Sequence, residues 1–300
     1  MATNKFDITI LTDSRYVDPA DRDWYVDNLL KEDNLVREAL EKKGLSVWRT
    51  NWDNSEFDWT ETKAVIFRST WDYFYRIDEF TRWLKLVSKM TRLLNPLEQI
   101  MWNLDKHYLR ALESKGINIP PTEIIEAGDS RSLQELTECL GWNEVVLKPA
   151  ISGAARHTYS LNPATVSEHE DTYRELIATE SMLIQPFQQN IINKGEMAYM
   201  VFAGKYSHAV LKLAKKGDFR VQDDFGGTVE QYNPSEEEIQ FAEQAVLACD
   251  PIPIYARVDI IIDNEGGLAV TELELIEPEL WFRLHTPAAE QLAEAIIKTF

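Results

Sequence analysis

Apolar and polar positions divide the chain into a front part, where strands and helices alternate, and a rear part that is richer in strands. Near the N-terminus, period-two alternation and short apolar runs predict strands over residues 7–11, 45–50 and 64–68. A helical period over residues 35–44 lies between the first two strands, and Gly44 is suited to end that helix. The pattern therefore predicts a β-α-β arrangement at the start of the chain.

After this β-α-β start, strands and helices do not alternate regularly along the chain. A helical period over residues 78–90 is followed by Asn95-Pro96, where we place a domain boundary. Two prolines make residues 117–125 extended. Further helices are predicted at 97–115, 235–249 and 287–300, and further strands at 144–150, 181–187, 196–204, 205–214, 254–263 and 267–277. A single doubly wound sheet is therefore not expected.

The composition narrows the class of protein. The 300 residues, of which 44% are apolar, allow about two domains at roughly 100–200 residues each. The 31 basic and 50 acidic residues leave a formal charge of -19, which argues against a nucleic-acid-binding surface. The sequence shows no membrane-spanning apolar run and no signal peptide. Cys139 and Cys249 suggest no disulfide framework, so we expect a cytoplasmic protein with reduced thiols.

The hairpin predicted at residues 254–277 carries three carboxylates. Side chains alternate along a strand, so Arg257 and Asp259 lie on one face of the first strand. For the same reason, Glu272 and Glu274 lie on one face of the second strand. If the two strands pair through the turn sequence DNEGG, Asp259 comes close to both glutamates. Such carboxylates repel one another unless a cation lies between them, and oxygen ligands suit Mg²⁺ or Mn²⁺. A solvated outer face of an edge hairpin is the alternative.

Two lysines are candidates for binding phosphate. Lys148 ends a buried-looking strand and precedes Pro149 and the small-residue loop ISGAARHT, where backbone amides can approach a phosphate closely. The stretch is neither a Walker A loop nor GxGxxG, and an ordinary strand that ends in Lys-Pro is the alternative. Lys106 lies in a predicted helix, where a solvated surface lysine is the ordinary interpretation.

Taken together and in order, these features resemble the ATP-grasp superfamily over roughly residues 95–285. The resemblance implies that Lys106 and Lys148 bind phosphates and that Ser152 and Gly153 open a flexible loop. It also implies that the strand near residue 185 contacts adenine and that the start of the next strand contacts the ribose. The implied nucleotide-binding residues there are Gln185, Pro186, Phe187 and Glu196.

The stretch GDFRVQDDFGG at residues 217–227 is similar to a loop of the ribosomal-protein glutamate ligases within this superfamily. By that resemblance, Arg220 is a catalytic residue that binds the transferring phosphate, and Gly226-Gly227 lets the loop fold over it. Gln222 stands where that branch has asparagine. A hairpin tip with a loose glycine bend is the alternative.

The resemblance also assigns roles on the predicted hairpin. Arg257 and Asp259 match the Arg-x-Asp strand of the superfamily, which makes Arg257 a second implied catalytic cation. Glu272 matches the glutamate of the Glu-x-Asn strand, and Glu274 stands where asparagine is usual. The implied metal ligands are thus Asp259, Glu272 and Glu274, with Glu277 as a further candidate, around a site more anionic than is usual.

The stretch FRSTWDYFYR directly follows a predicted strand, where open α/β sheets place ligand-binding loops. Its cation, hydroxyls, anion and aromatic rings suit a zwitterionic, amino-acid-like substrate. RSTWDY and ELELIEPEL also resemble a small ATP-grasp subgroup that includes the D-cycloserine-forming ligase. The alternative is that the rings pack a domain interface and Arg68 pairs with Asp72. The candidate substrate-binding residues are Arg68, Ser69, Trp71, Asp72, Tyr73 and Arg283, with Asp13 and Arg15 in second place.

The sequence thus predicts an α/β protein of α+β ATP-grasp architecture, similar also to glutathione synthetase. A β-α-β N-terminal substrate-binding domain, residues 1–95, would precede two α+β subdomains that grip ATP. These are a central lid subdomain, residues 96–185, and a C-terminal subdomain with the metal site, residues 186–300.

The expected activity is that of an ATP- and Mg²⁺- or Mn²⁺-dependent ligase. It would join a carboxylate to an amine or another nucleophile through an acyl phosphate, on a small amino-acid-like substrate. The alternatives are an amino-acid ligase that extends a peptide or protein tail, a nucleotide-binding protein without ligase activity, and an ATP-grasp kinase. The expected partners are the small-molecule substrate and a second copy of the chain in a homodimer. Binding to nucleic acid or to a membrane is not expected.

Overall fold

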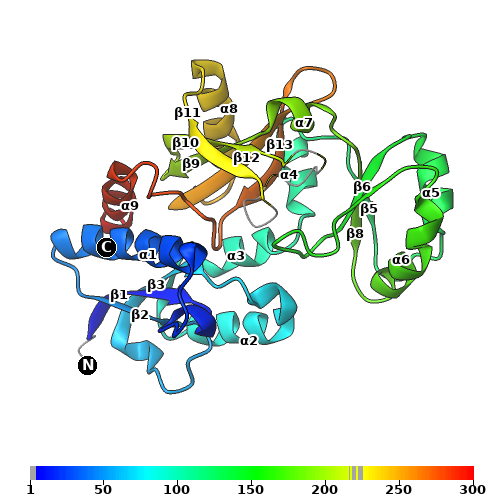
Figure 1. Cartoon of the computed structure of the whole chain (residues 1–300). Helices are drawn as coiled ribbons and strands as arrows, with labels where there is room; N and C mark the ends of the chain where they lie inside the picture. Colours follow the sequence, from blue (N-terminus) through cyan, green and yellow to red (C-terminus); the bar gives the residue numbers. More distant parts are fainter. Residues whose placement is uncertain (1–4, 216, 218–220, 222–225) are drawn as a thin grey trace.

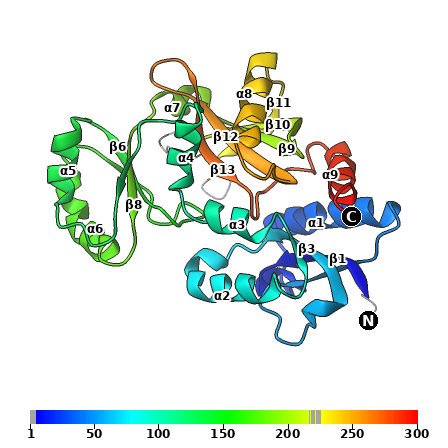
Figure 2. The same ribbon diagram turned by 180° about the vertical axis from the view of Figure 1, so that it is seen from behind.

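The computed structural model describes residues 5–215, 217, 221 and 226–300. Three sheets with their helices form three lobes, which correspond to the first, middle and last parts of the chain (Figure 1). Figure 2 shows the same three lobes from behind, with the first sheet below the last one. No helix within the described residues is long and apolar enough to cross a bilayer. The predicted α/β fold class is confirmed.

The first lobe is built on a parallel sheet of strand order β2-β1-β3-β4. An α-helix connects the first strand to the second, which pairs parallel to it, so the predicted β-α-β start is confirmed. Its elements are β1 (Phe6–Thr12), η1 (Ser14–Tyr16), α1 (Trp24–Lys42), β2 (Val47–Asn51), η2 (Trp59–Glu61), β3 (Thr62–Ser69), η3 (Tyr73–Tyr75), α2 (Ile77–Val87) and β4 (Arg92–Leu94).

Helix α1 begins at Trp24 rather than at residue 35, so the predicted helix was too short. Asp23 caps it by accepting a hydrogen bond of 2.9 Å from a backbone N–H of the first turn. The apolar period is hidden because Glu32 and Asp33 occupy its inner face, where both are almost completely buried. Each of them is bonded to groups from other segments of the chain, which offsets the cost of burial.

The single helix predicted over residues 97–115 is wrong. Two short helices occupy this stretch, α3 (Leu97–Asn103) and α4 (Tyr108–Ser114), and Lys106 lies in the turn between them. The backbone N–H of Lys106 donates to the carbonyl of Ala150, at 2.9 Å, and not to its own helix. The break therefore anchors this lysine beside the end of a strand from the second lobe.

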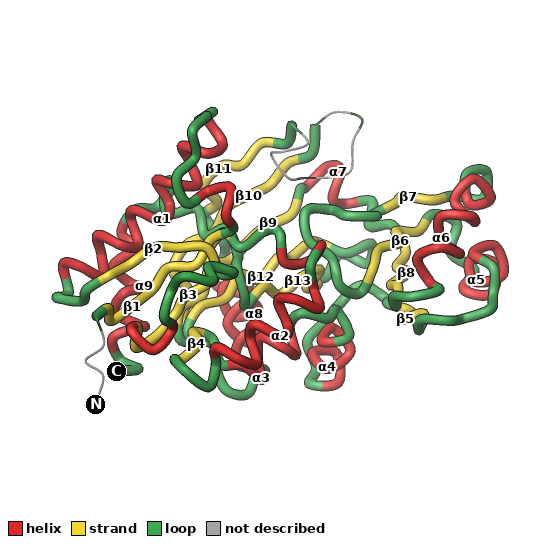
Figure 3. Tube along the Cα trace, turned by 90° about the horizontal axis from the view of Figure 1, so that it is seen from below, coloured by secondary structure: helices red, strands yellow, loops and turns green. Residues whose placement is uncertain are grey.

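The second lobe is an antiparallel sheet of order β5-β8-β6-β7. The view from below in Figure 3 shows it at one end of the molecule, away from the other two sheets. Helices α5 and α6 were not predicted, and α5 begins with a capping box between Ser132 and Glu135. The elements are β5 (Glu123–Ile125), α5 (Leu133–Leu140), β6 (Val145–Pro149), β7 (Tyr159–Leu161), η4 (Val166–His169), α6 (Glu170–Ile177) and β8 (Met182–Pro186).

The third lobe is an antiparallel sheet of order β11-β10-β9-β12-β13, covered by helix α8. Strands β12 and β13 pair as the predicted hairpin, with Asp259 opposite Glu272 and Arg257 opposite Glu274. The elements are α7 (Asn190–Lys194), β9 (Glu196–Phe202), β10 (Lys205–Leu213), β11 (Thr228–Tyr232), α8 (Glu236–Leu247), β12 (Tyr255–Ile262) and β13 (Leu268–Glu274).

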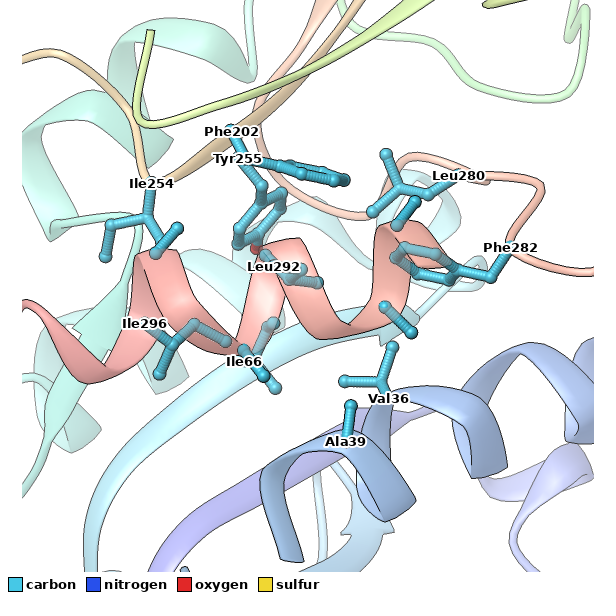
Figure 4. Packing of buried hydrophobic residues seen from close by; sticks show 14 of the residues in the cluster. Val36, Ala39, Ile66, Phe202, Ile254, Tyr255, Leu280, Phe282, Leu292 and Ile296 are labelled. Carbon is cyan, nitrogen blue, oxygen red and sulfur yellow. The ribbon is translucent and has the colours of Figure 1, made fainter. Parts of the chain in front are cut away.

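The last helix, α9 (Pro287–Ile297), returns to the first lobe and packs beside α1 (Figure 1). In Figure 4 it lies between the elements that carry Val36 and Ile66 and the strand that carries Tyr255. Leu292 and other side chains of α9 are completely buried there. This helix joins the first and third lobes through one apolar core. The division at residues 95 and 185 stays a prediction.

Candidate active site

A cavity of about 600 Å³ opens where the three lobes meet. Its walls come from segments that are far apart in the sequence, and they include most of the predicted nucleotide-binding, metal-binding and substrate-binding residues. These are Trp71, Tyr73, Lys106, Lys148, Ser152, Gly153, Gln185, Pro186, Phe187, Glu196, Arg257, Asp259, Glu272 and Glu274. The structure therefore brings them together around one space.

The β12–β13 hairpin presents three carboxylates to this cavity. One oxygen each from Asp259, Glu272 and Glu274 lies within 4.8 Å of the others, which is a geometry that could hold a metal ion. The side chain of Asp259 is almost fully buried. The side chains of Glu272 and Glu274 are 31% and 27% exposed. The proximity predicted from strand alternation is confirmed, while the role of these residues as metal ligands stays a prediction.

Two cations neutralise the buried part of this cluster. Arg257 donates to Asp259 through Nε, at 3.0 Å, and through Nη2, at 2.9 Å, and it also pairs with Glu274. Lys212 on β10 lies 3.0 Å from Asp259 and 2.5 Å from Glu196. Removing either cation would leave a buried carboxylate without its partner, which is more costly than losing the pair.

The pKa values of the cluster show that its own cations do not balance it completely. Burial raises the pKa of Glu274 to about 8, and the charges of Glu272 and Asp259 add to that rise. Burial also opposes ionisation of Asp259 and Glu272, but the cations beside each of them hold its pKa below the ordinary value. Glu274 is therefore the carboxyl group of this cluster that keeps its proton at neutral pH.

Lys106 faces the cavity from the turn between α3 and α4, and Lys148 faces it from β6 of the second lobe. The ammonium group of Lys106 donates to the carbonyl of Ser152, at 2.8 Å, and lies 3.0 Å from Glu272. Burial lowers the pKa of Lys148, and the charge of Glu272 opposes that shift in part. Lys148 makes no ion pair within the described residues, so an anionic ligand in the cavity would gain from its charge.

The small-residue loop after Lys148 has an unusual backbone. Ala154, Ala155 and His157 have φ angles of 48°, 54° and 49°, in the left-handed region that L residues rarely adopt. Gly153 has little room, because a Cβ built there would lie 2.6 Å and 2.7 Å from two ring atoms of Phe74. The loop that borders the predicted phosphate site is thus packed against an aromatic ring from the first lobe.

The strand predicted to contact adenine is β8, which ends at the cavity. The side-chain amide of Gln185 is turned away to donate to the hydroxyl of Thr122, at 2.7 Å. The backbone N–H of Phe187 donates to the carbonyl of Glu144, at 2.8 Å. The predicted contact of this strand with adenine, and that of Glu196 with ribose, stay predictions.

Two site residues were not predicted. Lys212 follows His208 and Val210 on one face of β10, and an almost fully buried lysine at the end of an apolar strand is a signal that could have indicated it. Trp281 covers the cluster, with its ring centroid 5.2 Å from the guanidinium of Arg257 and 5.9 Å from the ammonium of Lys212. No sequence pattern indicated that tryptophan.

The predicted substrate residues of the first lobe divide into two groups. Trp71 and Tyr73 line the cavity, and so do Arg15 and Tyr16. Arg15 is held by Asp13, whose carboxylate accepts from its Nε at 3.1 Å and from its Nη2 at 2.7 Å. The aromatic part of the prediction therefore agrees with the position of these side chains.

The other four predicted substrate residues do not line this cavity. Arg68 is almost fully buried, where it donates to the carbonyl of Pro278, at 2.9 Å, and lies 3.8 Å from Asp33. The other three residues are bonded elsewhere: Ser69 bonds Thr12, Asp72 bonds Trp52 and Arg76, and Arg283 pairs with Glu32 and Glu279. The alternative pairing of Arg68 with Asp72 is wrong, because each has other partners, while the substrate roles of the four residues stay predictions.

The predicted catalytic Arg220 lies outside the described residues, as do most of its neighbours in the GDFR loop. Its role therefore stays a prediction.

The fold and the cavity are those of a nucleotide-dependent ligase, and comparison with known proteins identifies the family. Residues 106–296 match the RimK-like ATP-grasp domain, and residues 8–95 match the N-terminal domain of D-cycloserine synthetase DcsG. The chain belongs to the RimK-like ATP-grasp family. The predicted ATP-grasp resemblance and class of enzyme, an ATP-dependent C–N ligase, are confirmed.

Individual relatives share both parts of the chain. The cycloserine biosynthesis protein DcsG of Streptomyces lavendulae is 28% identical over 278 residues, which cover 86% of this chain and 90% of that protein. The crystal structure of D-cycloserine synthetase DcsG superposes with a TM-score of 0.86 at 25% identity, covering 97% of this chain and 99% of the other. D-alanine–D-alanine ligase from Bacillus anthracis shares the fold, with a TM-score of 0.68 at 17% identity and coverage of 98% and 97%.

The contact between Gly153 and Phe74 predicts a specific double-mutant result. Gly153→Ala forces its new methyl group into the Phe74 ring, so the loop must move, and we expect binding of the ATP analogue AMPPNP to weaken about tenfold. Phe74→Ala removes the obstacle, so G153A should cost far less in the F74A background. Calorimetric titration of the four proteins measures this, and losses that simply add would contradict the proposed contact.

The raised pKa of Glu274 predicts how stability depends on pH. Its folded pKa of about 8 lies above the ordinary 4.5, so the folded protein keeps a proton that the unfolded chain has lost. The resulting stabilisation falls as pH rises towards 8. The glutamine side chain of the Glu274→Gln variant stays uncharged at every pH. The free energy of unfolding of the variant minus that of wild type should therefore increase between about pH 6 and pH 8. Urea denaturation without divalent ions tests this, and a constant difference would be inconsistent with a raised pKa.

Proposed function

We propose that the protein is an ATP- and Mg²⁺-dependent ligase that joins the carboxylate of a small amino-acid-like molecule to a nitrogen nucleophile. The observation that carries this proposal is the convergence of Lys106, Lys148, Lys212 and Arg257 on one cavity beside three carboxylates. The similarity to a cycloserine biosynthesis protein over most of both chains supports a small substrate.

The proposed reaction explains why so many cations are needed. A carboxylate resists attack by an amine because it is negatively charged and because its oxygen is a poor leaving group. Phosphorylation removes both obstacles, but it requires an anionic carboxylate to approach an anionic triphosphate. Lys148 and Arg257 supply fixed positive charge in a water-poor cavity, where electrostatic stabilisation is strong.

Asp259, Glu272 and Glu274 are the residues that would hold Mg²⁺ or Mn²⁺. Oxygen ligands are what these ions prefer, and the three oxygens are close enough to share a cation. A divalent ion would favour the ionised form of Glu274, whose pKa burial raises to about 8. When bound, such an ion would neutralise charge on the phosphate oxygens. Glu277 is not a member of this three-residue group.

The bonds change in two steps. An oxygen of the substrate carboxylate attacks the γ-phosphorus of ATP, ADP leaves, and an acyl phosphate forms. The nitrogen of the nucleophile then attacks the acyl carbon, inorganic phosphate leaves with the bonding electrons, and the nitrogen releases a proton. Exclusion of water protects the acyl phosphate from hydrolysis, and Phe74 and Trp281 contribute apolar walls for this purpose.

The nucleotide would lie between the second and third lobes. We assign its phosphates to Lys106, Lys148 and the loop that begins at Ser152 and Gly153. The adenine would lie along the end of β8, and the ribose beside Glu196. Arg220 would approach the transferring phosphate. A homodimer and a cytoplasmic location are further expectations of the same proposal.

One alternative function has some structural support. The ATP-grasp ligase PsnB, solved with a precursor peptide, shares the fold with a TM-score of 0.62 at 14% identity, covering 99% of this chain and 98% of the other. The side chain of Tyr75, with 68% of its surface exposed, borders the cavity and offers an aromatic contact for a peptide. The higher identity and TM-score of the cycloserine synthetase make the small substrate our first choice.

An ADP-release assay with Mg²⁺-ATP and a panel of D- and L-amino acids tests the proposal. We expect at least one amino acid to stimulate ADP release. Lys148→Met should reduce that rate about 100-fold or more, because it removes a charge that faces the phosphates. Lys31→Met, on the exposed face of α1, is the matched control and should retain the wild-type rate.

Three results would each refute the proposal. Nucleotide binding without any substrate-dependent ADP release would favour the non-catalytic alternative. Accumulation of a stable phosphorylated substrate, without bond formation to nitrogen, would favour a kinase. Stimulation by peptides alone would favour the ligase that extends peptide tails.

A further inference from the structure

The cavity has an aromatic wall on the side of the first lobe that the nucleotide and metal assignments do not use. Tyr16, Tyr25, Trp71 and Tyr73 all line it. The Trp71 ring lies 6.3 Å from the ring of Tyr16 in an edge-on arrangement, and 6.1 Å from the ring of Tyr25. Aromatic faces arranged in this way attract cations through their ring quadrupoles.

Glu277 faces the same part of the cavity and is held there by two of these aromatic residues. The indole N–H of Trp71 donates to its backbone carbonyl, at 3.1 Å. The hydroxyl of Tyr73, which is almost fully buried, lies beside its carboxylate and interacts with it. One contact thus fixes the backbone and the other fixes the side chain, so the carboxylate is positioned before any ligand arrives.

Glu277 differs from the other carboxylates of the cavity in having no cationic partner. Each of the others forms an ion pair with a lysine or an arginine: Glu196 and Asp259 with Lys212, Glu272 with Lys106, Glu274 with Arg257, and Glu279 with Arg283. Glu277 forms no ion pair with any residue in the part of the chain that the structure describes. A half-buried carboxylate of this kind is costly unless a cation reaches it from outside the protein.

We propose that Glu277, together with Tyr73 and the aromatic wall around Trp71, forms the subsite that binds the ammonium group of the amino-acid-like substrate. This inference rests on the proposed function, because it assigns the two charged groups of the proposed substrate to two neighbouring sets of residues. The substrate carboxylate faces Arg257 and the metal ligands, and its ammonium group faces Glu277. Tyr73 and Trp71 act as positioning residues for that carboxylate.

The geometry favours an ammonium ion over a metal ion as the occupant. Glu277 lies outside the three-carboxylate group, and Trp71 and Tyr73 are the residues that hold it. A primary ammonium group offers three N–H donors to a carboxylate, and its positive charge is attracted by the faces of neighbouring aromatic rings.

The experiment compares substrates with and without the amino group in the full-length protein. ADP release is measured with Mg²⁺-ATP and the pairs D-alanine and propionate, D-serine and D-glycerate, and their L counterparts. Glu277→Gln should raise the KM for the amino member of the active pair about tenfold or more, because a charged hydrogen bond is lost. It should leave the KM for the desamino member and for ATP within about twofold.

Two further variants separate positioning from folding. Tyr73→Phe keeps the ring but removes the hydroxyl that interacts with Glu277, and should raise the KM for the amino substrate about threefold. Glu265→Gln, in the exposed turn of the β12–β13 hairpin, is the matched control and should change nothing.

The outcomes distinguish this inference from the proposed function. An E277Q variant with an unchanged KM for the amino substrate would overturn the inference, and so would equal increases for the amino and desamino substrates or for ATP. In each of these cases the ligase activity itself would remain. If no amino acid stimulates ADP release in the wild-type protein, the proposed function and this inference both fail.

Discussion

The balance of charge on the β12–β13 hairpin is the constraint on which the site depends. Asp259 is buried beside two glutamates, and this arrangement is tolerable only because cations reach it from separate segments. Arg257 comes from the hairpin itself, Lys212 comes from β10, and Lys106 comes from the break between α3 and α4. The fold therefore assembles the proposed phosphate-binding cations and the proposed metal ligands as one network. Burial raises the pKa of Glu274 to about 8, and a further cation beside it would favour its ionised form.

The network is useful only if the first lobe closes the cavity, and the junction between the lobes is built for this purpose. The amide of Asn95 donates to the carbonyls of Tyr255 and Leu275, at 3.0 and 2.8 Å, and its oxygen accepts from the N–H of Ile254, at 2.6 Å. The hydroxyl of Tyr255 lies 2.8 Å from the carbonyl of Leu94 and 2.7 Å from that of Ile276, on the two sides of the junction, and shares its one proton between them. Together with the packing of α9, these bonds fix the aromatic wall against the segment after β13 that bears Glu277.

Local patterns predicted those parts of the site that depend on one or two neighbouring elements. Strand alternation and a turn sequence were sufficient to predict that Asp259 lies close to Glu272 and Glu274. The break at Lys106 was missed because it depends on a carbonyl from β6, which no local period reveals. The length of α1 was missed because Glu32 and Asp33 are buried with partners from distant segments. The burial of Arg68 away from the cavity was missed for the same reason, since its partners are far away in the sequence.

The central claim is that the hairpin carboxylates and the surrounding cations form one site for a divalent ion and a triphosphate. Electron paramagnetic resonance of Mn²⁺, titrated into the protein with AMPPNP, tests this most directly when wild type is compared with the double variant Glu272→Gln, Glu274→Gln. The account predicts a protein-bound Mn²⁺ signal that requires the nucleotide in the wild type and an affinity at least about tenfold weaker in the variant. Equal affinity in the two proteins would contradict it.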